Sequence, residues 1–167
     1  MLKAVFTGTI LLVVASCADY QFKVNDRVIY TPAPLYAEYE IPDEAFRECI
    51  KQHVGDGAMT NASQLTELNC SHAGVTSLEG IEVFTALARL KLSSNAITDV
   101  GPLAPLAQLS DIYLDGNSIR SLLPLRGLAE LVYLDVKGNI QLVCAELPHF
   151  QAISKLTLVA PRHCQAN

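Results

Sequence analysis

The chain has 167 residues, of which 50% are hydrophobic and 17% are charged, and its formal net charge is -5. This composition argues against intrinsic disorder, which needs few apolar residues, and against general nucleic-acid binding, which needs a basic surface. The length is that of one ordinary domain, and 20 of the 24 leucines lie between Leu65 and Leu158, which predicts a repetitive aliphatic core.

The first segment has the pattern of an export signal. Lys3 supplies a positive charge, the run from Ala4 to Ala15 is apolar, and small residues follow it. The apolar run is too short to cross hydrocarbon about 30 Å thick as a helix. We therefore expect a removable signal over residues 1–16 and no lasting transmembrane anchor.

The end of this segment, Val14-Ala15-Ser16-Cys17, resembles the lipobox of bacterial lipoproteins. The resemblance implies that Cys17 becomes an acylated N-terminus and that its lipid chains hold the protein on a membrane. Lipoproteins of proteobacteria use Asp after this Cys as an inner-membrane signal, so Ala18 implies the outer membrane. The alternative is ordinary cleavage after Ala18, which would leave a soluble periplasmic or secreted protein.

A tether and a cap are predicted next. Residues 17–40 form the tether, with a short strand at Val28-Ile29-Tyr30 and an extended, proline-containing stretch after it. Residues 41–64 form a helical N-terminal cap, whose first helix runs from Ile41 to Ile50 and whose second is expected at about 61–67. One apolar stripe of the first helix contains Phe46, Cys49, Ile50 and His53.

Residues 65–152 align with themselves at a constant period. Four full rows begin at Leu65, Leu87, Leu109 and Leu131, and a partial fifth row with a C-terminal cap covers residues 153–167. The pattern Leu-x-x-Leu-x-Leu-x-x-Asn-x-Ile resembles the leucine-rich repeat in the form found in bacterial internalins. This resemblance implies an α/β solenoid with short parallel strands on its concave face and irregular or 3-10 structure on its convex side.

Two columns of residues follow from stacking these rows. The alternation of apolar and polar residues predicts a strand with one buried face in each row. The buried column is expected to contain Leu90, Ile112, Leu134 and Leu156. A ladder of asparagines, Asn95, Asn117 and Asn139, recurs where the chain turns off each strand, and we expect its amides to bond backbone groups of adjacent turns.

The four cysteines after Cys17 are an even number in an exported chain, which predicts disulfides. Counting alone leaves three pairings open. The order along the chain favours Cys49 with Cys70 and Cys144 with Cys164, one bond in each cap. No cysteine and histidine spacing is typical of a zinc site, so no metal and no cofactor are expected.

The residues between the buried strand positions face the concave side, where a partner can select them. The first such column reads Glu67, Arg89, Asp111, Tyr133 and Lys155, and the next includes Lys91, Tyr113 and Asp135. Exposed tyrosines beside charges are typical of protein interfaces. We therefore predict partner-binding residues Arg89, Lys91, Asp111, Tyr113, Tyr133 and Asp135. The alternative is that the charges pair across strands and the tyrosines only cover the sheet.

These features predict a monomeric, noncatalytic lipoprotein of the bacterial envelope that binds a protein or another envelope component. No histidine is expected near both a nucleophile and a carboxylate, so no catalytic residue is proposed. The second hypothesis is a structural envelope component without a dedicated ligand, and a hydrolase is the third.

Overall fold

The computed structural model describes residues 22–24, 27–30 and 36–165, and the chain divides into two compact units, residues 1–34 and 35–167. In the first unit, strand β1 (Phe22–Val24) pairs antiparallel with β2 (Arg27–Tyr30). β2 contains the predicted strand, whereas β1 is additional to the prediction. The signal segment lies outside the described residues.

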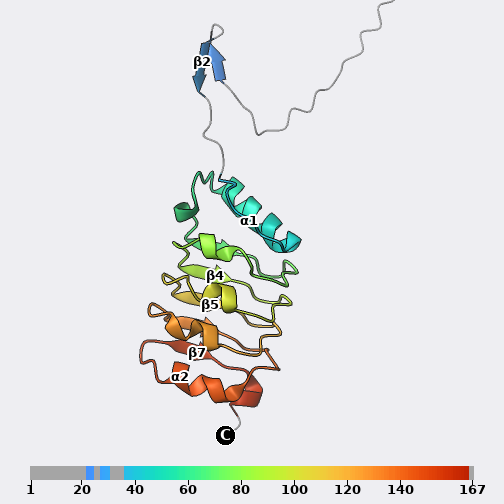
Figure 1. The fold of residues 1–167 in the computed structure, drawn as a ribbon, viewed down its shortest axis with the longest axis vertical. Helices are drawn as coiled ribbons and strands as arrows, with labels where there is room; N and C mark the ends of the chain where they lie inside the picture. The colour runs from blue at the N-terminus through green and yellow to red at the C-terminus, as the bar shows by residue number, and fades with distance from the viewer. Residues whose placement is uncertain (1–21, 25–26, 31–35, 166–167) are drawn as a thin grey trace, which may run out of the picture. The chain divides into compact units, whose positions relative to one another are not determined.

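The second unit is a solenoid in which five turns of the chain each contribute one strand to a parallel sheet (Figure 1). The strands, in chain order and in sheet order, are β3 (Glu67–Asn69), β4 (Arg89–Lys91), β5 (Asp111–Tyr113), β6 (Tyr133–Asp135) and β7 (Thr157–Val159). Turns of 3-10 helix lie between the strands at Ile81–Val83, Gly101–Leu103 and Leu123–Gly127. The predicted α/β solenoid is confirmed.

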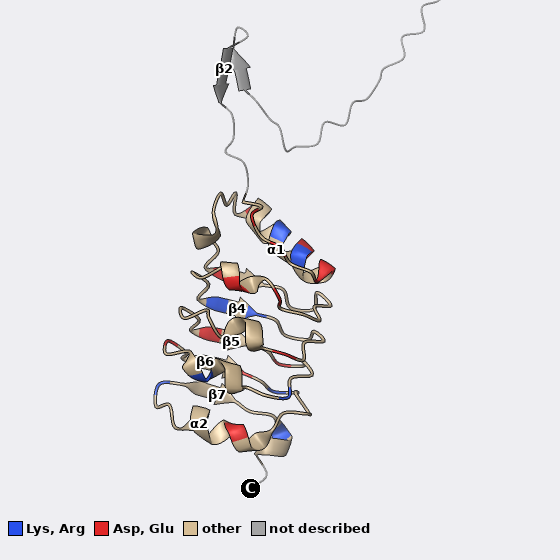
Figure 2. Ribbon diagram, in the orientation of Figure 1, with Lys and Arg blue, Asp and Glu red and all other residues tan. Residues whose placement is uncertain are grey.

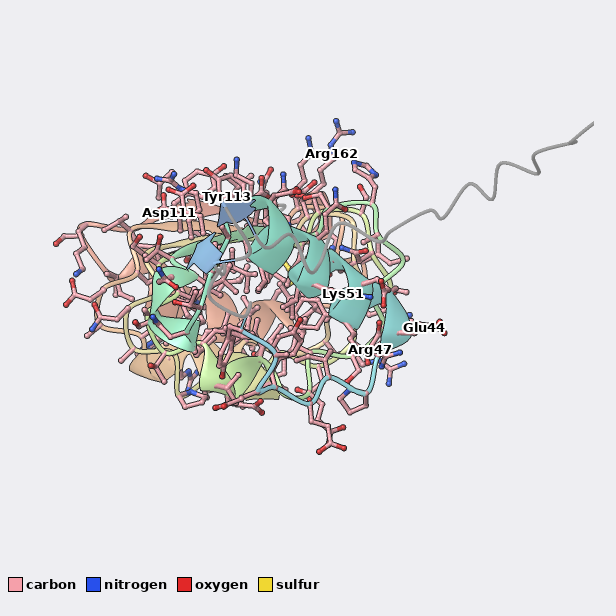
Figure 3. All side chains as sticks on the ribbon, turned by 90° about the horizontal axis from the view of Figure 1, so that it is seen from above. Glu44, Arg47, Lys51, Asp111, Tyr113 and Arg162 are labelled. Atoms are coloured by element: carbon pink, nitrogen blue, oxygen red, sulfur yellow. A yellow bond between two sulfur atoms is a disulfide. The ribbon has the colours of Figure 1, made fainter. Side chains whose placement is uncertain are left out.

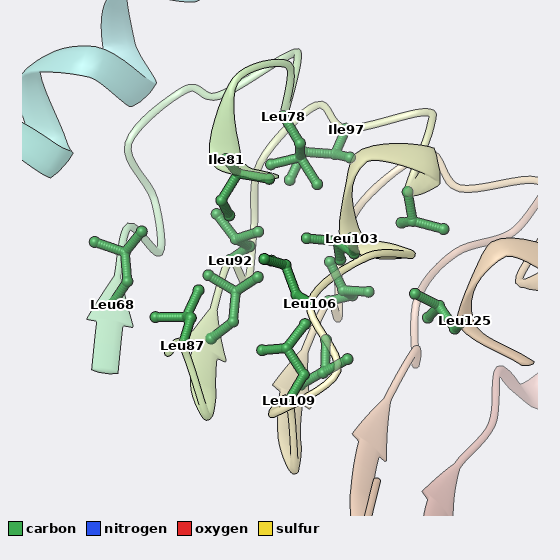
Figure 4. Packing of buried hydrophobic residues seen from close by; sticks show 14 of the residues in the cluster. Leu68, Leu78, Ile81, Leu87, Leu92, Ile97, Leu103, Leu106, Leu109 and Leu125 are labelled. Atoms are coloured by element: carbon green, nitrogen blue, oxygen red, sulfur yellow. The ribbon is translucent and has the colours of Figure 1, made fainter. Parts of the chain in front are cut away.

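The core of the solenoid is built from aliphatic side chains that stack from repeat to repeat (Figure 4). In the second repeat Leu87, Leu90 and Leu92 are each 0% exposed, while Arg89 and Lys91 between them are partly exposed. Full burial of one such side chain stabilises the fold by about 1.5–3 kcal/mol. The first four turns share this arrangement, so the period of the sequence becomes a continuous packed interior.

The asparagine ladder lies where the chain leaves each strand. The Nδ2 group of Asn117 donates to the carbonyls of Leu92 and Leu114, at 2.9 and 3.0 Å. Its Oδ1 atom accepts from the amide of Ile97 at 3.1 Å. Asn95 and its counterpart in the fourth repeat bond in the same way. These side chains thus satisfy backbone groups that would otherwise lack partners between successive turns.

The residue before each ladder position has left-handed backbone. Ser94, Gly116 and Gly138 precede the three ladder asparagines and have φ of 56°, 67° and 79°, and His72, which precedes Ala73 at the same position of the first repeat, has a φ of 59°. A Cβ atom on Gly138 would lie 3.1 Å from the amide nitrogen of Gly116. Glycine therefore relieves both the backbone strain and the close approach of adjacent turns at this end of the column.

The fifth repeat differs from the prediction. Strand β7 pairs with β6 so that Leu158, rather than Leu156, lies beside Leu134. The step from Leu134 to Leu158 is two residues longer than the step from Ile112 to Leu134, which is the constant spacing of the earlier strands. The fourth return segment, which is the longer one, contains helix α2 (Leu147–Gln151), which buries Phe150.

Helix α1 (Glu44–Asp56) covers the N-terminal end of the solenoid and continues past Ile50, the predicted end. It also starts later than the predicted Ile41, because Asp43 is its N-cap, whose Oδ1 atom accepts from the amide of Phe46 at 2.8 Å. The second predicted helix is a single 3-10 turn, Ala62–Gln64. A disulfide joins Cys49 of α1 to Cys70, which follows β3.

The chain before α1, residues 36–41, packs against the first repeat, and we call it the N-terminal strap. The ring of Tyr39 lies 5.6 Å from that of Phe84, centroid to centroid. Gly80 has a φ of 90°, and a Cβ atom there would lie 2.1 Å from the carbonyl oxygen of Glu40. The end of the predicted tether therefore belongs to the repeat domain.

The C-terminal end is closed by a 3-10 turn, Cys144–Glu146, that leads directly into α2. The carboxylate of Glu146 accepts from the hydroxyl of Ser121 at 3.0 Å and from the amide of Leu122 at 2.7 Å. A disulfide joins Cys144 to Cys164 in the final 3-10 turn. Thus α2, one carboxylate and one disulfide hold this end to the third and fourth repeats.

Candidate functional site

The structure brings the six predicted partner-binding residues together on β4, β5 and β6. In register across these strands lie Arg89, Asp111 and Tyr133 in one row, and Lys91, Tyr113 and Asp135 in the next. Figure 2 shows β4 blue and part of β5 red, so strands of opposite charge are adjacent. All six side chains are partly exposed. We call this set the concave patch.

Two tyrosines form the centre of the concave patch. The rings of Tyr113 and Tyr133 lie 4.8 Å apart, centroid to centroid, with an angle of 34° between their planes. The Nζ atom of Lys91 lies 5.4 Å from the centre of the Tyr113 ring. This distance is within the range of a cation–π contact, so Lys91 and the two rings form one continuous stack of contacts.

The edge of the concave patch nearest β3 is occupied by an ion pair. An Nη atom of Arg89 lies 2.9 Å from the carboxylate of Glu67 on the neighbouring strand. Both side chains are largely exposed, and pairs of this kind contribute about 0–1 kcal/mol. Arg89 therefore has a cross-strand partner, as the alternative interpretation of these charges expects.

Negative charge is in excess on the opposite side of the tyrosines. Burial raises the pKa of the Asp135 carboxyl, and the nearby carboxylate of Asp115 raises it further, against a backbone hydrogen bond from Lys137. Burial also raises the pKa of the Tyr133 hydroxyl, followed by the charge of Asp135. The carboxylates beside Tyr133 thus disfavour further negative charge and favour a cation.

The fifth member of each concave column is not the predicted one. The first column ends in Thr157 rather than Lys155, because β7 is shifted by two residues. Lys155 lies before the strand, and its Nζ atom is 3.9 Å from the carboxylate of Glu130. Val159 occupies the second column, beside Asp135. The described concave face therefore has less positive charge near β7 than the sequence predicts.

Two residues were absent from the predicted site. Asp115 lies just beyond β5 and accepts a hydrogen bond from the hydroxyl of Ser93. Its influence on Asp135 depends on the spacing of adjacent turns, although its column position was visible in the sequence. Ile140 is 78% exposed, and its only sequence signal is the change from Asn-x-Ile to Asn139-Ile140-Gln141-Leu142.

Two histidines of the caps, His53 and His163, bond to the backbone. The Nδ1 atom of His53 lies 3.0 Å from the carbonyl of Cys49, and its Nε2 atom accepts from the amide of Asn69 at 3.4 Å. The Nε2 atom of His163 donates to the carbonyl of Leu142 at 3.2 Å. These contacts orient the imidazoles within the caps.

The predicted lipidation residue, Cys17, lies outside the described residues. Cys144, Cys164 and His163 have ligand atoms within 4.8 Å of one another, but the two sulfur atoms are joined in a disulfide. Within the described ranges, every helix is too short or too polar to cross a membrane.

The fold is similar to that of solved internalins. An internalin from Listeria monocytogenes aligns with a TM-score of 0.64 and 26% identity, over 73% of this chain and 37% of that one. Internalin C2 from the same species aligns with a TM-score of 0.62 and 24% identity, over 76% and 60% of the two chains. This chain thus spans less than two thirds of either. No protein-family model and no curated protein sequence matches it. The protein has an internalin-like leucine-rich repeat fold.

Proposed function

We propose that this protein is a noncatalytic binding protein of the bacterial cell envelope, and that its concave patch holds a protein or another envelope component. The paired rings of Tyr113 and Tyr133 carry this proposal, because they occupy strand positions that the core does not use. Tyrosine supplies a large contact area at little cost in conformational entropy, and it is enriched at interface centres.

The charges around the rings favour a basic group on the partner. Lys91 already lies over Tyr113, while the ring of Tyr133 has Asp111 beside it on β5, Asp135 on its own strand and the charge of Asp115 nearby. A lysine or arginine side chain placed beside Tyr133 would gain both a cation–π contact and carboxylate partners. It would also relieve the repulsion between Asp115 and Asp135.

The size of the whole concave face, which includes the concave patch, favours a small contact. Five strands about 4.8 Å apart, with three outward residues each, give a projected area of about 300–400 Å². A standard interface buries about 800 Å² on each partner. The interaction is therefore weak or short-lived, unless loops beside the sheet contribute to it.

The proposed cellular location of the protein is inferred from its N-terminal sequence. We propose that Cys17 is acylated, because the preceding residues resemble a lipobox, and that Ala18 directs the lipoprotein to the outer membrane. Changing Cys17→Ser should release the protein from the membrane fraction of cells. Retention of the variant in the membrane would contradict lipid anchoring and leave the concave patch proposal unaffected.

The binding proposal is tested by crosslinking in cells from position 113. A photo-reactive phenylalanine replacing Tyr113 should capture a discrete partner, whereas the same group replacing Leu123, exposed on the convex side, should not. Tyr113→Ala with Tyr133→Ala should weaken the interaction with that partner about tenfold or more without lowering the melting temperature of the domain.

The second candidate is a structural envelope component, which is favoured by the ion pair between Arg89 and Glu67. Charge reversal with Arg89→Glu and Asp111→Lys distinguishes a structural role from a binding role when the crosslinked proteins of the variant and the wild type are compared. If the set of crosslinked proteins is unchanged by reversal and by loss of both tyrosines, the concave patch is a sheet surface without a ligand.

A further inference from the structure

The loop after the last ladder asparagine is longer than its counterparts. In the third repeat, the amide of Ser118 donates to the carbonyl of Ile97 in the preceding repeat, at 2.9 Å. In the fourth repeat, the amide of Val143 donates to the carbonyl of Arg120 in the preceding repeat, at 3.0 Å. The second bond encloses two residues more than the first, and its donor lies four residues after Asn139, whereas Ser118 lies one residue after Asn117.

This longer loop holds Ile140 in solvent. Its side chain is 78% exposed, and the other large hydrophobic residues that the structure describes as exposed reach at most 49%. The loop is fixed on both sides of Ile140, because the amide of Leu142 donates to the carbonyl of Asn139 at 3.1 Å and Arg120 donates to the side chain of Gln141 at 2.8 Å. Hydrogen bonds of the loop therefore fix the side chain of Ile140 in its exposed position.

A cavity of about 360 Å³ lies beside Ile140, between the long loop and the C-terminal cap. Its lining consists of Lys137, Gly138, Ile140, Pro161, Arg162 and His163. The imidazole of His163 bonds to the carbonyl of Leu142, and Pro161 is buried, so this wall is joined both to the loop and to the C-terminal cap. The volume is at the lower end of the range for ligand pockets, which is large enough for one large side chain.

The charge of this cavity is opposite to that of the whole protein. Lys137 and Arg162 contribute two cations, both exposed, and the lining contains no carboxylate, although the chain carries a net charge of -5. Arg120, in the preceding repeat, bonds to Gln141 of this loop and is a third cation near the loop, outside the cavity lining. An apolar wall between cationic side chains is complementary to an apolar group flanked by anions.

We propose that this cavity binds an acidic segment of a partner protein, with one large apolar side chain packed against Ile140 and carboxylates on Lys137 and Arg162. The site uses none of the six residues of the concave patch. Figure 3 shows Arg162 and Tyr113 projecting from the same side of the solenoid. The cavity is thus accessible from the side on which the concave patch lies.

Selection from random heptapeptides displayed on phage tests this specificity, with the purified full chain and both disulfides intact as the target. The enriched peptides should carry one Leu, Ile or Phe between Asp or Glu residues. A labelled synthetic copy of the enriched peptide should bind saturably by fluorescence anisotropy, and the affinity should fall as salt concentration rises.

Variants then locate the peptide. Ile140→Ser and Arg162→Glu should each weaken its binding about tenfold or more. Leu123→Ser and Arg126→Glu are the matched controls, because they change an exposed apolar residue and an exposed arginine of the convex side, and they should leave affinity unchanged. The double alanine variant of Tyr113 and Tyr133 should also bind normally, which separates this site from the concave patch.

Four results would overturn the proposal: no enrichment, enrichment of basic peptides, binding insensitive to both cavity variants, or binding of phosphatidylglycerol vesicles in place of acidic peptides. Sedimentation of the wild type and Ile140→Ser tests a second copy as the occupant, since a dimer lost in the variant would also contradict an acidic peptide. Melting temperatures within about 2 °C of wild type would establish that the exposed substitutions leave the fold intact.

Discussion

The two ends of the solenoid are closed by the same three devices, which are a helix, a disulfide and a carboxylate, but only one end disturbs the repeat register. At the N-terminal end, α1 precedes the first strand, and β3, β4, β5 and β6 keep a constant offset. At the C-terminal end, α2 lies between β6 and β7, and the offset there is two residues larger. A helix before the first strand thus leaves the offset between strands unchanged, whereas the segment that contains α2 is two residues longer than its counterparts.

The carboxylates illustrate how similar the two closures are. Asp43 accepts from the backbone amides of Thr76 and Ser77, in the first repeat, at 2.9 and 3.1 Å. Glu146 accepts from Ser121 and the following amide at the equivalent turn two repeats later. Each end of the solenoid is therefore joined to a convex turn by one acidic side chain.

Removal of a disulfide should have the largest effect and should distinguish the ends. The two bonds span 21 and 20 residues, so the chain-entropy model gives each about 3 kcal/mol of stability. Replacing Cys49 and Cys70 by Ala should cost more than replacing Cys144 and Cys164, because Cys70 is 1% exposed and its loss also leaves a void. The free energy of unfolding of the two double variants is measured by urea denaturation, with circular dichroism as the signal. A larger loss of stability on replacing Cys144 and Cys164 would contradict this expectation.

The next effect concerns the N-terminal strap. Gly80→Ala should destabilise the domain by about 2–5 kcal/mol, because the new Cβ atom adds an overpacked contact with Glu40 to the strain of left-handed backbone. Gly74→Ala is the matched control, since Gly74 has a φ of 83° and its Cβ atom would meet nothing within 4 Å. It should cost about 1–2 kcal/mol. Equal losses of stability in Gly80→Ala and Gly74→Ala, measured by thermal unfolding, would show that the N-terminal strap can shift away from Gly80 without a cost in free energy.

The smallest effect is a difference in acid sensitivity at the N-terminal cap. Burial raises the pKa of Asp43, but the hydrogen bonds from Thr76, Phe46 and Ser77 together lower it more, so the folded pKa lies below the unfolded value. The stabilisation is therefore complete above the unfolded pKa, about 3.9, and is lost as the pH falls through the folded pKa. Asp43→Asn should lower stability at pH 7 by about 1 kcal/mol or less and remove this acid-dependent part.

Melting temperatures measured from about pH 7 down to about pH 2.5 check this expectation, because stabilisation by such carboxylates is lost below about pH 5. The wild-type curve should approach that of Asp43→Asn at the acidic end. Parallel curves over the whole range would mean that the contacts of Asp43 with Thr76 and Ser77 do not favour its charged form.

Most of the fold follows from the sequence because the repeat supplies the same information several times. Leu90, Ile112 and Leu134 lie in one buried column, as the period predicts. The register of β7 could not be predicted in the same way. Leu156 continues the local pattern, but the length of the fourth return segment, which depends on three-dimensional packing, places Leu158 beside the sheet.

The concave patch was predictable for the same reason as the core. Alternation along each strand assigns Tyr113 and Tyr133 to the outward face, and the period places them on adjacent strands. The cavity beside Ile140 was not predictable. It depends on how far an irregular loop projects and on where the C-terminal cap places Arg162, and neither has a repeating signal.

The asparagine ladder has a consequence for the evolution of the protein. Each ladder residue bonds only to its own turn and to the preceding one, as Asn117 does with Leu114 and Leu92. A duplicated repeat unit inserted among the second and third repeats would therefore meet the same neighbours that the present units meet. The length of such a protein can change by gene duplication without any redesign of its ends, and each added unit would bring one more strand to the surface open to a partner.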